Sequence, residues 1–265
     1  MPKISVLMPA YNSENYIREA IDSILNQTYG DFEFVIVDDC STDGTWEIIK
    51  EYAKKDKRIK PLRNKKNSGV TVSLNNGLKK CSGEIIARMD SDDISTADRF
   101  EKQIKLMDKY DVVGANIIFI DENGKRFGKR KYSNDISGVI RLESPLAHPT
   151  VMFRKELVDK YGGYDEGYSN SQDYDLWLRF YSKNARIKNI DKYLLKYRIH
   201  LHSVKNSKTK NILRNTIRIK LKANKNYNIR LGSLGWCRLA CENLLLVLPE
   251  RLVLKLFYLL KGIKR

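Results

Sequence analysis

The sequence predicts an α/β protein with a doubly wound sheet, followed by a helical region at its C-terminal end. Three observations support this prediction. Short apolar runs alternate with amphipathic helical patterns up to about residue 110, polar and acidic clusters follow directly on the ends of these runs, and no strand pattern occurs beyond Lys205. Such alternation is typical of parallel strands joined by helices, a fold in which ligands bind at the carboxyl ends of the strands.

The first half of the chain contains four candidate parallel strands. They are the apolar runs Ile4–Met8, Phe32–Asp38, Arg58–Leu62 and Glu84–Met89. After the first run, apolar residues between Ile17 and Leu25 recur at the spacing of one helix face, and we expect Asn12 or Ser13 to cap that helix. A second helix is expected to begin near Thr45.

The pattern changes after residue 110. We expect strands at Val112–Ile120 and Thr150–Phe153, and a helix rich in aromatic residues at Asp173–Tyr181. Beyond Lys205 only helical patterns occur. The expected organisation is one domain over residues 1–205, divided into halves at 1–110 and 111–205, followed by a helical region over residues 206–265.

Basic residues are concentrated in that helical region. The 265-residue chain has a net charge of +17, and from Lys208 to Arg265 there are 14 Lys and Arg against two Glu, which leaves +12 in this stretch. Apolar runs separate these charges, so we expect the region to contact an anionic membrane surface, or else to pack on the first domain or a partner subunit. Nucleic acid fits less well, because the apolar runs would have no role there. The run Leu244–Leu260 is too short and too charged to span a bilayer.

The N-terminus and the cysteines narrow the expected location. The chain enters its first apolar strand without a signal-peptide pattern, so we expect a cytosolic protein. The cysteines are Cys40, Cys81, Cys237 and Cys241. None has the C-x-x-C spacing, so we expect neither a zinc site nor a disulfide framework.

An acidic cluster follows the fourth candidate strand. Asp90, Asp92 and Asp93 lie within four residues of one another directly after the run Ile85–Met89. Carboxylates this close repel one another, and a shared hard divalent ion such as Mg²⁺ or Mn²⁺ relieves that repulsion. The sequence therefore predicts a metal bound with a phosphate-bearing ligand, the alternative being an acidic turn that caps the next helix.

Two polar loops are expected at the same edge of the sheet. Strand one ends in Met8-Pro9-Ala10-Tyr11-Asn12, and strand two ends in a run from Val37 to Gly44 that contains Asp38 and Asp39. A tyrosine face stacks on a base and a carboxylate accepts the imide N–H of uracil, so these loops suit a uridine site. A turn with a helix cap is the alternative.

Two further segments have both a functional and a structural interpretation. The run Asn67-Ser68-Gly69-Val70 presents backbone N–H groups to a phosphate or is simply a helix start. Asp173 and Asp175 cannot share a helix face, so one is available as a base while the other caps the helix or pairs with Arg179 at i+4. The alternative is that both acids complement the helix dipole.

Six motifs occur in the order found in family 2 glycosyltransferases. They are M-P-A-Y-N, V-D-D-x-S-x-D-G-T, N-x-G-V, G-E-I-I-A-R-M-D-S-D-D, H-P-T-V-M-F-R and Q-D-Y-D-L-W-L-R, within about Ile4 to His200. The chain therefore resembles a bacterial member of that family with the GT-A fold, a doubly wound mixed sheet. The resemblance implies transfer of a sugar from a nucleotide-diphosphate donor with inversion at the anomeric carbon.

The resemblance also implies roles for individual residues. Together with the phosphate-facing run above, the candidate nucleotide-binding residues are Pro9, Tyr11, Asn12, Asp39, Asn67, Gly69 and Asp90. Asp39 would face uracil, and Asp90 the ribose or the edge of the metal. Asp92 is the second Asp of D-x-D, whereas Asp93 matches the last carboxylate of a shorter T-D-D form. Both are metal candidates, and we favour Asp92.

The late motifs supply the remaining candidates. The family normally has Glu-Asp where this chain has Gln172-Asp173, and the resemblance implies that Asp173 is the catalytic base. The segment around His200 resembles Y-R-x-H-x-x-S, in which the histidine approaches the diphosphate or metal; a surface or core position is the alternative. His148 of H-P-T is a weaker candidate of the same kind.

We therefore expect a metal-dependent inverting hexosyl- or N-acetylhexosaminyltransferase with a UDP-sugar donor and Mn²⁺ or Mg²⁺ as cofactor. Its expected acceptor is a saccharide or lipid-linked saccharide of a bacterial surface polysaccharide, met at the inner face of the cell membrane. Two alternatives come from other classes. One is a non-catalytic module that binds sugar nucleotides or membranes. The other is a sugar nucleotidyltransferase, which requires a Gly-rich basic N-terminal loop that Pro9-Ala10-Tyr11-Asn12 does not supply.

Overall fold

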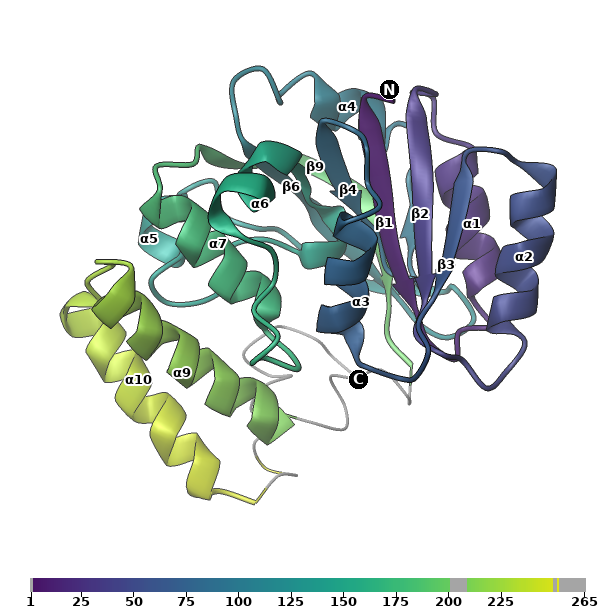
Figure 1. Cartoon of the computed structure of the whole chain (residues 1–265). Coiled ribbons are helices and arrows are strands. Elements are labelled where there is room, and N and C mark those ends of the chain that lie inside the picture. The colour runs from purple at the N-terminus through teal and green to yellow at the C-terminus, as the bar shows by residue number, and fades with distance from the viewer. Residues whose placement is uncertain (1, 201–208, 250–251, 253–265) are drawn as a thin grey trace.

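The computed structural model describes residues 2–200, 209–249 and 252. It contains a single mixed sheet with helices on both faces and a helical hairpin beside it (Figure 1). The strands are β1 Ile4–Ala10, β2 Phe32–Asp38, β3 Ile59–Arg63, β4 Ile85–Arg88, β5 Ile94–Ser95, β6 Val112–Ile120, β7 Arg126–Arg130, β8 Met152–Arg154 and β9 Ile187–Arg198. The helices are α1 Ile17–Leu25, α2 Thr45–Lys55, α3 Val70–Leu78, α4 Arg99–Ile104, α5 Ile136–Val139, α6 Lys155–Tyr161, α7 Gln172–Ser182, α9 Thr209–Asn226 and α10 Gly232–Val247.

The four parallel strands predicted from the apolar runs are confirmed. Strand β1 pairs in parallel with β2 on one side and with β4 on the other, and β2 pairs in parallel with β3. Since the chain winds outward from β1 in both directions, the strand order reverses between β1 and β4. Ligands of open α/β sheets bind at such a reversal, outside the carboxyl ends of the strands.

The sheet continues across the second half of the chain. Strand β8 pairs antiparallel with both β4 and β6, and β9 lies parallel to β6, so the full order is β3-β2-β1-β4-β8-β6-β9-β5 with β7 paired to β6. The expected strand at Thr150–Phe153 begins two residues later, because His148–Thr150 forms a 3₁₀ turn. Strand β9 was not predicted: its twelve residues carry charges on the exposed side and contain no continuous apolar run.

Two hydrophobic cores lie on opposite faces of the sheet. Alternate residues of β1 divide between them, because side chains of a strand point to opposite faces in turn. Leu7 packs in the core covered by α3, α6 and α7, whereas Val6 and Met8 pack in the core covered by α1, α2 and α4. Both faces are therefore buried, as the apolar strands predict for a doubly wound sheet.

The expected side-chain cap of the first helix is wrong. Helix α1 begins at Ile17, with Tyr16 at the capping position and without a side-chain cap bond. Ser13 instead uses its backbone carbonyl, which accepts the N–H groups of Tyr16 and Ile17, while the Asn12 side chain accepts a hydrogen bond from the neighbouring loop. Both residues thus shape the polar loop after β1 rather than the helix.

The C-terminal helices pack on the first domain. Helix α9 lies between α10 and α7 in Figure 1, and Ile219 and Ala223 of α9 belong to the core that contains α7. None of the helices in the described part of the chain combines the length and apolar character required to span a bilayer. The domain boundary expected near residue 205 and most of the apolar run after Pro249 lie outside the described residues.

A buried carboxylate joins α9 to α7. Asp175 is fully buried, accepts hydrogen bonds from Lys222 (2.8 Å) and Tyr227 (3.1 Å), and lies 3.6 Å from Arg179, its expected partner at i+4. Lys222 also donates to Asp165 at 2.8 Å. Burial opposes the charge of Lys222, but its hydrogen bonds to Asp165 and Asp175 outweigh burial and raise the pKa of Lys222.

We predict that Lys222→Ala lowers the free energy of unfolding by about 2–4 kcal/mol, because it leaves the Asp175 carboxylate buried without its main cation. Lys225→Ala is the matched control, since Lys225 is exposed on the same helix, and its effect should stay within about 0.5 kcal/mol. Urea unfolding followed by circular dichroism measures both. Equal losses in the two variants would contradict a structural role for the ion pair.

Candidate active site

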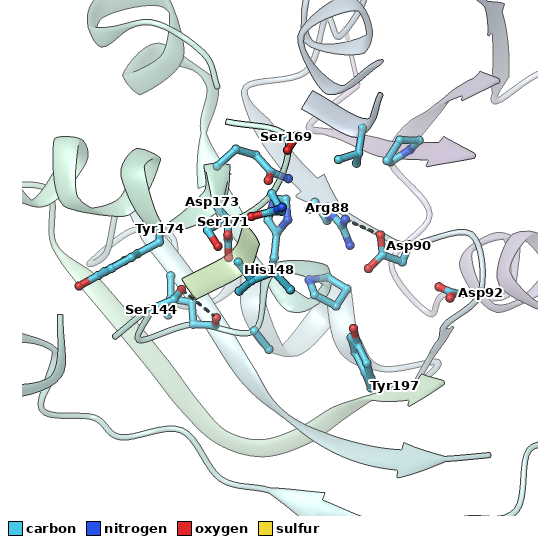
Figure 2. Close-up of a pocket in the computed structure, with 18 of the residues that line it drawn as sticks. Arg88, Asp90, Asp92, Ser144, His148, Ser169, Ser171, Asp173, Tyr174 and Tyr197 are labelled. Atoms are coloured by element: carbon cyan, nitrogen blue, oxygen red, sulfur yellow. Dashed lines mark hydrogen bonds and ion pairs between the residues drawn. The ribbon is translucent and has the colours of Figure 1, made fainter. Parts of the chain in front are cut away.

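A single cavity of about 1310 Å³ runs from the carboxyl ends of β1 and β4 to the start of α7 and the α9–α10 hairpin. Both halves of the chain contribute to it. The sequence-predicted residues that line it are Pro9, Tyr11, Asn12, Asp39, Asp90, Asp92, His148, Asp173 and His200. Figure 2 shows Asp173 and Ser171 on one side of this cavity and Asp90 and Asp92 on the other, with Arg88 and His148 between them.

The loop after β1 forms one end of the cavity. Tyr11 is 46% exposed and presents its ring there. Asn12 adopts a left-handed conformation (φ 47°), and the loop is tied to the loop after β2: the Asn12 amide donates to Ser41 Oγ at 3.0 Å, and the Thr42 amide donates to Asn12 Oδ1 at 2.9 Å. These bonds hold two loops, far apart in the sequence, at the edge where the strand order reverses.

Asp39 is the centre of the neighbouring loop. Its carboxylate accepts hydrogen bonds from the Asn64 side chain (2.7 Å) and from the amides of Ser68 (2.9 Å) and Gly69 (2.7 Å). In this structure the amides of Ser68 and Gly69 therefore bind Asp39 rather than being presented to a phosphate, and Asn67 and Gly69 are not among the residues that line the cavity. A carboxylate has about four acceptor sites, so Asp39 retains one for a ligand.

The three acidic residues after β4 converge. Asp90, Asp92 and Asp93 each offer a carboxylate oxygen within 4.8 Å of the others. Asp90 pairs with the buried guanidinium of Arg88, and Asp92 Oδ2 lies 3.1 Å from His200 Nε2. Ser91 Oγ lies 2.7 Å from Ser13 Oγ, which connects the acidic loop to the loop after β1.

The end of β9 holds the acidic loop in place. The Arg198 amide donates to Asp93 Oδ1 at 2.8 Å, and its guanidinium donates to the Asp92 carbonyl at 2.9 Å. The same guanidinium reaches the carbonyls of Asp121 and Glu122 in the β6–β7 turn and the Glu19 carboxylate of α1. Because His200 follows two residues later, the strand that orders the loop also brings the histidine to Asp92.

The electrostatics of the cluster suit a divalent cation. Burial, and then the charges of Asp92 and Asp90, raise the pKa of Asp93 well above its usual range. Within the described part of the chain, Asp93 Oδ2 is buried without a hydrogen-bond partner. Hard oxygen ligands with one imidazole suit Mn²⁺ or Mg²⁺, so the residues present fit such an ion.

The opposite end of the cavity is built on the start of α7. Ser171 adopts a left-handed conformation (φ 59°) immediately before the helix, and the half-buried Asp173 lies in the first helical turn. Asp175 is directed away from the cavity into the ion pair with Lys222. The two acids therefore divide between a structural and a cavity-lining position, as their spacing predicts.

Unpartnered polar atoms gather around the cavity. Among the described residues, the buried atoms without a hydrogen-bond partner include Arg88 Nε and Nη1, Asn170 Nδ2 and Gln172 Oε1, and all three side chains line the cavity. A buried polar group without a partner costs about 1–3 kcal/mol, so native proteins rarely retain several together without a reason. A polar ligand in this cavity would satisfy these atoms.

Several lining residues were not identified from the sequence. Arg88 is a charged residue inside an apolar strand, which is a signal that sequence reasoning passed over. Arg198, which orders the acidic loop without lining the cavity, lies two residues before His200 and was not singled out either. The α9–α10 hairpin contributes Ile212, Leu213, Thr216, Arg238, Cys241, Glu242 and Leu245. No local pattern marks these residues, because their place in the cavity depends on how the hairpin packs.

Comparison with known proteins identifies a family and several relatives. The family model described as glycosyl transferase family 2 matches residues 5–184. The chain is 41% identical over 213 residues to the O-antigen biosynthesis glycosyltransferase WbnJ of Escherichia coli, covering 77% of this chain and 82% of that protein. It is 39% identical over 203 residues to the putative glycosyltransferase EpsE of Bacillus subtilis, covering 74% of this chain and 73% of that one.

Solved structures share the fold. TarS 1–349 of S. aureus, crystallised in complex with UDP, matches with a TM-score of 0.67 at 25% identity, over 84% of this chain and 66% of that chain. The chain thus spans just under two thirds of that structure. A mannosyltransferase from Pyrobaculum calidifontis matches with a TM-score of 0.65 at 20% identity, over 91% of this chain and 74% of that chain. The expected GT-A fold is confirmed.

His148 is held neutral in the cavity wall. Its Nε2 lies 2.8 Å from Tyr164 Oη, and its ring packs edge-on against Trp177. Burial, and then the charge of Arg88, lower the pKa of His148 well below its usual range. The unfolded chain therefore binds a proton near pH 6.5 that the folded chain does not bind, so acid favours unfolding.

We predict that the wild-type protein loses up to about 1.4 kcal/mol of stability per pH unit below pH 6.5 relative to His148→Asn, until the pH reaches the folded-state pKa. Urea unfolding of both proteins at pH 7.5, 6.5 and 5.5 measures the difference. Parallel pH profiles would show that His148 titrates alike in the folded and unfolded states.

Proposed function

The chain belongs to glycosyl transferase family 2, and on that premise we propose that it transfers a sugar, with inversion at the anomeric carbon, from a nucleotide-diphosphate donor to a hydroxyl of a lipid-linked saccharide. The reaction would serve the synthesis of a bacterial surface polysaccharide, as the names of its relatives state for them. One observation carries the proposal: Asp173 lines the same cavity as Tyr11, Asp90 and Asp92.

The donor is proposed to be a UDP-sugar bound at the β1 end of the cavity. The exposed ring of Tyr11 offers a stacking surface, and the remaining acceptor site of Asp39 suits the imide N–H of uracil. The UDP complex of TarS, at 25% identity, supports the same choice. Pro9 and Asn12 are proposed to shape the loop beside the base, and Asp90 to face the ribose or the edge of the metal. The transferred sugar is proposed to be a hexose or an N-acetylhexosamine.

The metal site is proposed at Asp90, Asp92, Asp93 and His200. A bound Mn²⁺ or Mg²⁺ would neutralise the negative charge that develops on the departing nucleotide. Of the two candidates left open by the sequence, we favour Asp92 as principal ligand, because it lines the cavity and faces His200 whereas Asp93 lies buried behind it.

Asp173 is proposed as the general base. Its position in the first turn of α7, across the cavity from Asp90 and Asp92, suits removal of a proton from an acceptor hydroxyl that attacks the face of the sugar opposite the leaving group. Gln172 replaces the acid expected beside it, so a single carboxylate performs the proton transfer. No covalent intermediate is required.

The place of work is proposed to be the cytoplasmic face of the membrane, with region 206–265 in contact with it. The α9–α10 hairpin supports this placement, because it forms the wall of the cavity at the acceptor end. An acceptor carried by a lipid would then approach the base from the side of the hairpin.

Asp173→Asn should reduce sugar transfer by about 10²- to 10⁴-fold, since proton transfer in the transition state contributes about that much. UDP affinity, measured by calorimetry, should remain unchanged because Asp173 lies at the other end of the cavity. Asp108→Asn is the control: it removes the same charge at an exposed position and should leave UDP release unaltered. Near-normal transfer by the Asp173 variant would exclude it as the base.

Asp92→Asn should weaken Mn²⁺ binding in the presence of UDP by about tenfold or more, with the fold retained, because it removes a ligand oxygen. A chelator should abolish UDP release, and added Mn²⁺ should restore it. Calorimetric titration of Mn²⁺ into the UDP complex measures the affinity. If UDP release persists in the presence of the chelator, the proposed role of the metal is wrong. A different result would exclude the enzyme altogether: a wild-type protein that binds UDP and Mn²⁺ but releases UDP from none of the donors, even with acceptors present, would be a binding module.

A further inference from the structure

Helix α10 has an inverted charge distribution. It is the outermost element of the molecule beside α9 (Figure 1), so its exposed side would ordinarily be charged. Its two charged residues are Arg238, whose side chain is 39% exposed, and the buried Glu242, and both lie on the side of the helix that lines the cavity. Arg238 bonds Glu143 of the first domain at 2.9 Å, and Glu242 is buried against Lys220 of α9 at 2.6 Å.

The outward side of α10 carries no charge at all among its described positions. Four large apolar residues are exposed there: Leu234 (67%), Trp236 (49%), Leu244 (67%) and Val247 (80%). The remaining exposed residues on this side are small or uncharged, namely Gly232, Ser233, Cys237, Ala240 and Asn243, while the exposed Cys241 lines the cavity. We call this surface the outward face of α10. It would be unusual for a surface permanently covered by water.

Helix α9, which packs against α10, carries an exposed row of basic residues that we call the basic edge of α9. Helix α9 contains no acidic residue, and its exposed positions include Arg214, Arg218 and Lys225, with Arg230 exposed in the following turn. Apolar residues on one surface and Lys or Arg beside them are the combination that lies in a membrane interface, where anionic headgroups meet the cations and acyl chains meet the apolar side chains.

We propose that the outward face of α10, with the basic edge of α9, docks on an anionic lipid surface. This inference deepens the membrane contact proposed above for region 206–265 and rests on that proposed function. It also reconciles the two interpretations that the sequence left open for the region. The hairpin packs on the first domain through Ile219, Ala223 and the ion pair of Lys222, and it is proposed to meet lipid through its exposed surface, so the two interpretations describe different faces of one element.

The position of the face fits delivery of a lipid-linked acceptor. Cys241 and Leu245 line the acceptor end of the cavity, and Leu244 and Val247 are exposed on the same two turns of α10. Apolar surface therefore continues around the helix from the cavity to the outside. A saccharide whose lipid remains in the bilayer would reach Asp173 along this edge without leaving the membrane surface.

The net charge favours lipid over a second copy of the chain as the partner of the outward face of α10. Two copies meeting through α10 would also bring their basic edges together, in a protein whose net charge is +17, and like charges across an interface oppose association. An anionic bilayer would instead bury the exposed apolar side chains of α10 and neutralise the basic side chains of α9.

The test uses the full chain and vesicles of phosphatidylcholine with or without phosphatidylglycerol. Co-sedimentation should show binding to the anionic vesicles and little to the neutral ones. The double variant Leu244→Ser with Val247→Ser should weaken that binding by about tenfold or more, because each substitution removes an apolar side chain that would be buried in the membrane interface. Phe127→Ser removes a partly exposed aromatic from β7 and is the matched control, with binding unchanged.

The charge requirement has its own pair of variants. Arg214→Glu with Lys225→Glu should also weaken binding by about tenfold or more, because each cation near the surface contributes to the attraction. Lys79→Glu with Lys80→Glu changes the net charge equally at exposed positions after α3 and should leave binding unaltered. Equal losses of vesicle binding in both pairs of variants would mean that binding depends only on the net charge of the protein, and this would overturn the proposal.

Trp236 reports directly on insertion. Trp177 is fully buried in the core and Trp46 lies on α2, so brominated acyl chains should quench the fluorescence of Trp236, and Trp236→Phe should remove the quenching while preserving binding. Three results would each overturn the proposal. They are absence of quenching, absence of binding to anionic vesicles, and a dimer that is seen in sedimentation and that dissociates in the variant with Leu244→Ser and Val247→Ser. UDP release from the donor without vesicles is measured in parallel, so failure of the transferase function is seen independently.

Discussion

The mutual repulsion of three carboxylates at the end of β4 is the constraint around which the site is organised. Asp93 is buried, and the charges of Asp92 and Asp90 raise its pKa further, so the loop would be unstable if its acids were held together by packing alone. The chain counters this with two buried arginines. Arg88 pairs with Asp90 from within β4, and Arg198 fixes Asp93 and the Asp92 backbone from the end of β9.

This arrangement explains why the sheet extends beyond its parallel half. A sheet of β1 to β4 alone would supply the β1 end of the cavity, but nothing to fix the acidic loop. Strand β9 returns alongside β6, and its end places Arg198 and His200 against that loop, while β8 bridges β4 to β6. The mixed part of the sheet thus carries the start of α7 and the acidic loop on one framework, which sets the position of Asp173 relative to Asp90 and Asp92.

The sequence was sufficient for the parts of the fold that depend on local pattern. The parallel strands, the long strand β6 and helix α7 follow from apolar periodicity, and the convergence of Tyr11, Asp39 and Asp90 follows from the geometry of parallel strands. The sequence did not predict the features whose position depends on tertiary contacts. Strand β9 has no continuous apolar run, because exposed charged residues alternate with buried positions that include the polar Asn189 and Arg198. The Gly69 amide binds Asp39, which lies 30 residues earlier, and Arg238 lines the cavity only because α10 packs there.

The unpartnered atoms along the cavity connect stability to function. Among the described residues, Arg88, Asn170 and Gln172 each bury a polar atom that has no hydrogen-bond partner, and each such atom costs stability unless a further group satisfies it. A core built for stability alone would replace them with apolar side chains of similar volume. These three side chains lie on the wall between the acidic cluster and Asp173, so a polar ligand that filled the cavity would be placed to complete their hydrogen bonds, and its binding would then recover part of the free energy that their burial costs.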